Sequence, residues 1–149
     1  MKLHRYLAAP IAALSLTTSA TGADTQKVEI SAVPGGVMKY DKAEITVKAG
    51  QAVELTFSNP DVLQHNLLIL KPGTKEKVGA AADAMLTNPE AIKRGYIPSS
   101  SDILYATKLL NPSQSETLTF TIKDPGSYPI ICTFPGHWRL MHAVLKVVK

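Results

Sequence analysis

Three side chains near the C-terminus can bind a soft or borderline metal ion. Cys132 is the only cysteine of the chain, His137 follows five positions later, and Met141 follows four positions after that. They offer a thiolate sulfur, an imidazole nitrogen and a thioether sulfur. The dipeptide Pro135-Gly136 between them is a strong turn signal. The segment can therefore fold back and direct Cys132 and His137 toward one point.

A fourth ligand must come from a distant part of the chain, and His65 in Gln64-His65-Asn66 is the candidate. Two histidines, one cysteine and a weak axial methionine are the ligand set of a blue-copper electron-transfer site. We therefore predict that His65, Cys132, His137 and Met141 bind a single copper ion.

Other uses of these residues explain less of the pattern. A buried cysteine is often a small hydrophobic residue, and a methionine near a strand is usually part of the core. A Cys–His nucleophilic pair leaves Met141 and His65 unexplained, and no acid or amide stands out to orient it. Structural zinc sites favour several cysteines or histidines over a thioether. We expect no enzymatic activity, because copper oxidases and nitrite reductases need a second copper site with more histidines.

Residues 132–141 resemble the ligand loop of azurin, a member of the cupredoxin (plastocyanin/azurin) family of type 1, or blue, copper proteins. The resemblance extends to His65-Asn66 and to residues 106–109 and 115–120. It implies that Cys132, His65 and His137 are equatorial ligands and that Met141 is the weak axial one. In azurin a backbone carbonyl lies opposite the methionine, and the corresponding residue here is Gln64 instead of the usual glycine.

The resemblance also assigns residues around the ligands. Asn66 would tie the two ligand segments together through Thr133, and backbone N–H groups near Asn66 and Phe134 would hydrogen-bond the thiolate and tune its potential. His142 stands where relatives commonly have glycine. Because strand alternation points it away from Met141, we expect it to be exposed.

Residues 1–23 are predicted to be a secretory signal peptide, because basic Lys2 and Arg5 precede an apolar run and then a small polar segment. Cleavage after Ala20 or after Ala23 is compatible with this pattern. The apolar run is shorter than the ~20 residues that a membrane span needs. The protein is therefore expected to be periplasmic or otherwise exported, with no membrane span after cleavage.

Residues 24–149 are predicted to form one domain. Without Lys2 and Arg5 the formal net charge falls from +4 to +2, and scattered lysines give no support for nucleic-acid binding. Azurins usually carry a disulfide near the N-terminus, which a chain with one cysteine cannot form.

Alternating apolar residues, such as Val53, Leu55 and Phe57, predict strands separated by turns. Seven or eight strands of this kind indicate an all-β Greek-key sandwich, which is the cupredoxin fold. Helical spacing from Val78 to Leu86, with a second short turn at 89–94, predicts a helical insertion that matches the flap of azurin-like proteins. We expect Met85 to pack this helix onto the sheet.

The predicted function is that of a mobile electron carrier, cycling between Cu(II) and Cu(I) and acting as a monomer. The alternative is a periplasmic copper-binding or delivery protein without redox cycling. Electrons should pass through the edge of His137, and transient redox partners should dock on the apolar rim around it. That rim is predicted to contain Val62, Leu63, Phe134, Pro135 and Leu140. Trp138 and Arg139 adjoin it, and the charge of Arg139 predicts a carboxylate on the partner.

Overall fold

The computed structural model describes residues 24–149, so the predicted signal peptide lies outside the described residues. The described chain forms eight strands, one α-helix and one 3-10 turn. These are β1 (Gln26–Ser31), β2 (Glu44–Lys48), β3 (Ala52–Asn59), β4 (Leu68–Leu70), α1 (Lys75–Ala84), the 3-10 turn η1 (Met85–Thr87), β5 (Ile103–Ala106), β6 (Gln114–Thr121), β7 (Gly126–Ile131) and β8 (His142–Val148).

The strands make two sheets that pack face to face. One sheet has the order β1-β3-β6 and the other has the order β2-β8-β7-β4-β5. Strand β3 shows how the sequence sets the faces, because Val53, Leu55 and Phe57 are buried while the residues between them are only half-buried. This alternation is what a strand with one face on the core requires. The predicted all-β sandwich is confirmed.

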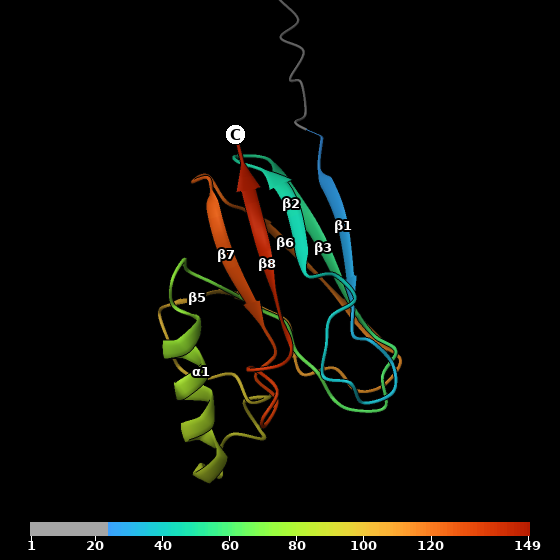
Figure 1. Ribbon diagram of the computed structural model, residues 1–149, viewed down its shortest axis with the longest axis vertical. Helices are drawn as coiled ribbons and strands as arrows, with labels where there is room; N and C mark the ends of the chain where they lie inside the picture. Colours follow the sequence, from blue (N-terminus) through green and yellow to red (C-terminus); the bar gives the residue numbers. More distant parts are fainter. Residues whose placement is uncertain (1–23) are drawn as a thin grey trace, which may run out of the picture.

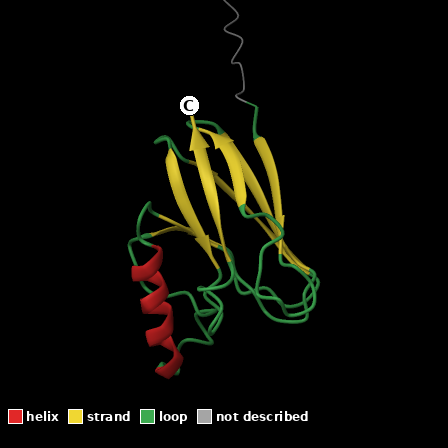
Figure 2. Cartoon of the chain, viewed as in Figure 1, coloured by secondary structure: helices red, strands yellow, loops and turns green. Residues whose placement is uncertain are grey.

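Strand β4 departs from alternation, since Leu68, Ile69 and Leu70 are all fully buried. Ile69 faces the sandwich core, whereas Leu68 and Leu70 pack against Val78 and Ala82 of helix α1 on the outer face. Figure 2 shows this helix outside the strands, at the lower left of the view. Burial on both faces explains the continuous apolar run.

The segment that joins β7 to β8 lies at one end of the sandwich. In Figure 1 strand β7 runs down and β8 runs up, and residues 132–141 connect them at the lower end. His65 approaches the same end just before β4, where its backbone exchanges hydrogen bonds with Leu110. Two segments far apart in sequence therefore meet at this end of the sheet.

Strand β5 ends at Ala106, because the next hydroxyl, that of Thr107, accepts the backbone N–H of Leu67. Residues 89–94 form turns, as predicted. The side chain of Asn88 accepts the N–H of Glu90, a local bond that competes with helical pairing. Among residues 24–149 no helix has the length and apolar character needed to cross a membrane.

Candidate metal centre

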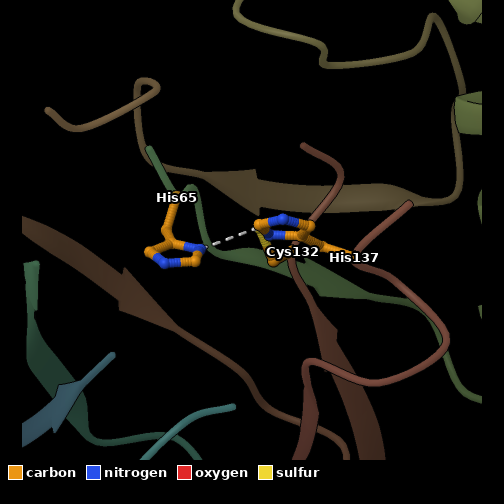
Figure 3. A group of neighbouring side chains, drawn as sticks. All are labelled: His65, Cys132 and His137. Atoms are coloured by element: carbon orange, nitrogen blue, oxygen red, sulfur yellow. Dashed lines mark hydrogen bonds between the residues drawn. The ribbon is translucent and has the colours of Figure 1, made fainter. Parts of the chain in front are cut away.

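The structure brings the side chains of His65, Cys132 and His137 together. Cys132 Sγ lies 3.8 Å from His65 Nδ1 and 3.6 Å from His137 Nδ1. The three possible ligand atoms all lie within 4.8 Å of one another, and the three residues are buried. Figure 3 shows the His65 ring facing the Cys132 side chain, which overlaps the His137 ring in this view. One metal ion can therefore meet all three donors.

The ligand loop is held by its own backbone. Its ends are tied by a bond from Cys132 N–H to the Met141 carbonyl (3.1 Å). Inside the loop, His137 N–H donates to the Phe134 carbonyl and Met141 N–H to the His137 carbonyl. Gly136 has a φ of 82°, which glycine adopts without strain. This closed loop directs His137 inward and places fully buried Met141 in the same core cluster as Cys132.

Hydrogen bonds between Asn66 and Thr133 join the two ligand segments. Asn66 Oδ1 accepts the backbone N–H of Thr133 at 2.7 Å, and its Nδ2 donates to Thr133 Oγ1 at 3.0 Å and to the Gly95 carbonyl at 3.0 Å. The two partners are 67 residues apart in sequence. This is the tie that the sequence resemblance implies, and it fixes His65 relative to Cys132 through their neighbours.

The Cys132 sulfur sits in an apolar environment with two backbone donors. Burial raises the pKa of the thiol to about 12 from its ordinary 9.0, although the N–H groups of Asn66 and Phe134 act to lower it. Those N–H groups face the sulfur, as the sequence resemblance implies. They stabilise the thiolate that a metal ion requires as its ligand.

His65 is held from behind by a carboxylate. Its Nε2 lies 2.8 Å from Asp61 Oδ2, and the two side chains are 1% and 0% exposed. Burial acts to raise the pKa of Asp61, but hydrogen bonds from His65, Gly36 and Val62 outweigh it and lower the pKa to about 2. For His137, burial lowers the pKa to about 4, with a further contribution from His65. Its imidazole is therefore neutral at pH 7.

This donor set fits a copper ion. A thiolate, two imidazole nitrogens and a thioether match the soft and borderline ligands that copper takes in blue-copper sites. The ligands are buried, so the protein excludes water from them. The nearest zinc alternative uses more thiolate or histidine ligands, and among the described residues this is the one group of three or more such side chains.

Comparison with known proteins decides the family. The profile of "Copper binding proteins, plastocyanin/azurin family" matches residues 26–148, nearly the whole described chain. The chain belongs to the plastocyanin/azurin family. The members of this cupredoxin family are blue copper proteins, known for electron transfer, and their cofactor is one copper ion.

Individual cupredoxins resemble the chain closely. Auracyanin-A from Chloroflexus aurantiacus is 36% identical over 129 residues, covering 85% of this chain and 77% of its own. Azurin-1 from Alcaligenes xylosoxydans xylosoxydans is 28% identical over 121 residues, covering 74% and 90%. The solved structure of auracyanin A, described as a "blue" copper protein, has a TM-score of 0.73 and 35% identity and covers 84% of this chain and 100% of its own.

Phe134 and Leu140 of the predicted apolar rim lie next to His137. Val62 and Leu140 are 74% and 62% exposed, the largest exposures in the rim, while Leu63, Phe134 and Pro135 are half-buried. The Phe134 ring lies 4.8 Å from that of His137. An exposed apolar surface thus adjoins an imidazole that is itself only 3% exposed.

The charge of Arg139 has a partner within the chain. Its guanidinium makes two hydrogen bonds to the carboxylate of Asp83 on helix α1, at 2.7 and 3.2 Å, so its charge is already paired within the chain. Trp138, predicted to adjoin the rim, is 5% exposed, and its indole N–H donates to Asp83. The two residues fasten the ligand loop to the helix, so Arg139 does not require a carboxylate on a partner.

Three further residues were singled out in the sequence analysis. His142 is exposed at the start of β8, and Met85 is buried beside helix α1, both as expected. The side chain of Gln64 donates to Asn111 at 2.7 Å, and its carbonyl as a ligand stays a prediction. Sequence reasoning did not identify Asp61. The spacing of four residues from His65 was the available signal.

Proposed function

We propose that the protein is an exported electron carrier that cycles between Cu(II) and Cu(I) at one type 1 copper site. His65, Cys132 and His137 would be the equatorial ligands and Met141 the axial one. A bound copper ion supplies a one-electron couple. The observation that carries the proposal is the buried convergence of the three donors, at 3.6 and 3.8 Å from Cys132 Sγ, at the end of a rigid sheet.

The chain's own residues perform the remaining tasks. Asn66 and Thr133 hold the two ligand segments in register. The N–H groups of Asn66 and Phe134 stabilise the thiolate. A site held this firmly changes little between oxidation states, and small reorganisation is what fast electron transfer requires. His137, next to the exposed rim, offers the shortest way from the buried site to a partner.

The rim supports transient docking of a redox partner. Val62, three residues before His65, and Leu140, whose N–H donates to the His137 carbonyl, are exposed large apolar side chains, and such surfaces mark interaction sites. We further propose that residues 1–23 are removed on export, that residues 24–149 are the mature domain, and that the protein acts as a periplasmic monomer without enzymatic activity.

A cycling experiment tests the carrier against the delivery alternative. The copper-loaded protein would be reduced with ascorbate and reoxidised with ferricyanide over repeated cycles in the presence of a Cu(I)-specific chelator. A carrier keeps its copper and regains its full visible absorption after each cycle. Progressive transfer of copper to the chelator would contradict the carrier proposal and favour delivery.

A further inference from the structure

We propose that Asp61 is a positioning residue of the metal centre: its carboxylate fixes the proton of His65 on Nε2, directs Nδ1 toward the metal and favours the oxidised ion. Only the effect on the oxidised ion rests on the proposed copper function. The tautomer and the orientation of His65 do not depend on it.

The contact between the two side chains determines the tautomer. His65 Nε2 and Asp61 Oδ2 are 2.8 Å apart and almost completely buried. An ionised carboxylate can only accept hydrogen bonds, so Nε2 carries the proton. When Nε2 carries the ring proton, the lone pair is on Nδ1, the atom that lies 3.8 Å from Cys132 Sγ. Metal-binding histidines typically need such a partner on the other nitrogen.

Asp61 is itself firmly held. Its Oδ1 accepts the N–H of Gly36 at 2.8 Å, and its own N–H donates to Asn59 Oδ1 at 3.1 Å. Asn59 in turn donates to the carbonyls of Leu63 and Leu110. Gly36 has a φ of 72°, a conformation that favours glycine, and it brings this loop over the carboxylate. The hydrogen bonds fix the carboxylate where it meets the ring.

The two histidines are consequently unequal. Within residues 24–149, His65 pairs with the carboxylate of Asp61, and no ion pair involves His137. The ring of His137 instead contacts Phe134 next to the exposed rim. The negative charge therefore acts on the centre through His65, while His137 is left free of a charged partner at the docking surface.

A buried carboxylate behind one ligand changes the relative stability of the two oxidation states. It makes the imidazole a better electron donor, and its negative charge favours the more positive of two charge states. Asp61 should therefore raise the affinity of the site for Cu(II) relative to Cu(I). This keeps the reduction potential of the site low.

The first test uses the copper-free, wild-type protein at neutral pH. Long-range proton–nitrogen NMR of the imidazole rings reports which nitrogen carries the proton. We expect His65 to carry it on Nε2, in a protected, hydrogen-bonded state. A proton on Nδ1 would overturn the proposal. This measurement needs neither copper nor a variant, so its outcome is independent of the proposed function.

The second test compares Asp61→Asn with Asp124→Asn, which removes the same charge from an exposed side chain. We expect Asp61→Asn to lower the Cu(II) affinity relative to that for Cu(I) by roughly tenfold or more, which raises the reduction potential by at least ~59 mV for one electron. Equal potentials in the two variants would overturn the effect on the oxidised ion. If Asp61→Asn does not fold, the NMR measurement decides whether Asp61 fixes His65. A wild-type protein that forms no blue site would refute the proposed function instead.

Discussion

The indole of Trp138 lies directly on Gly79 of helix α1, so closely that a methyl group at Gly79 would overlap the ring at Cδ2 and Cε3. Trp138 follows the predicted ligand His137, and its N–H donates to Asp83 of the same helix at 3.0 Å. The Arg139 guanidinium adds two bonds to Asp83 and lies 4.2 Å from the Trp138 ring centroid. Helix α1 thus supports the ligand loop from outside the sandwich.

Gly79→Ala should loosen this support. The added methyl group cannot be accommodated without moving Trp138, and overpacking of this kind costs about 1–3 kcal/mol. The free energy of unfolding of the copper-free protein, measured with denaturant, checks this. Gly126→Ala is the matched control, because its methyl group would meet Tyr128 only at an ordinary 3.5 Å. Equal stability of the two variants would show that the loop does not depend on the helix.

The hydrogen bonds of Asn66 between the ligand segments give a second prediction. Asn66→Ala leaves the buried N–H of Thr133 and the carbonyl of Gly95 without their side-chain partner. An unsatisfied buried group costs about 1–3 kcal/mol, so the free energy of unfolding should fall by at least this amount. Asn111→Ala, which removes an exposed amide bonded to Gln64, should cost much less. A small effect at Asn66 would mean that Thr133 finds another partner.

The copper-free protein should lose stability as the pH falls below 6.5. The pKa of His137 is about 4 when folded and 6.5 ordinarily, so between these values the unfolded chain binds the extra proton. The free energy of unfolding therefore rises from pH 4 to pH 6.5, by up to about 3 kcal/mol. Asp61, with a folded pKa of about 2 against 3.8, extends the loss below pH 4.

Denaturant unfolding at a series of pH values measures this profile. In His137→Gln the rise between pH 4 and pH 6.5 should largely disappear. His142→Gln is the control. His142 is exposed, and burial lowers its pKa less than it lowers the pKa of His137. A profile that His137→Gln leaves unchanged would place the titrating group elsewhere.

Electron exchange between two copies of the protein tests the rim. Leu140→Glu puts a charge on each of two apolar surfaces that must meet, and like charges oppose such contact. The self-exchange rate, from NMR line broadening of mixed oxidation states, should drop by roughly tenfold, equivalent to ~1.4 kcal/mol. Ser127→Glu adds the same charge opposite Lys146 at the far end of β7, and it should leave the rate nearly unchanged. Equal rates would remove the rim from the electron route.

Local patterns were sufficient to predict much of the molecule. The alternation in β3 and the turn at Pro135-Gly136 act within a few residues, so the sandwich and the ligand loop follow from short stretches of sequence. The pairing of Asn66 with Thr133, by contrast, came only from resemblance to a family, because nothing local links residues that far apart.

Sequence reasoning missed two contacts, one between near neighbours in sequence and one between distant segments. Aspartate is a residue type that is common in turns. The loop at Gly36, whose N–H donates to Asp61, helps to hold it as a buried partner of His65. Arg139 reads as a free surface charge until helix α1 places Asp83 against it. Gly36 is 25 residues from Asp61 and Asp83 is 56 residues from Arg139, so local patterns do not define where either lies.

The central claim is that Cys132, His65 and His137 hold one copper ion in a blue site. The most direct test is the visible absorption and EPR spectrum of the mature protein, purified without metal and loaded with one equivalent of Cu(II). The account predicts an intense blue thiolate-to-copper band with a narrow copper hyperfine splitting, both lost in Cys132→Ser. A colourless protein with ordinary copper signals would show that the donors do not act together and would contradict it.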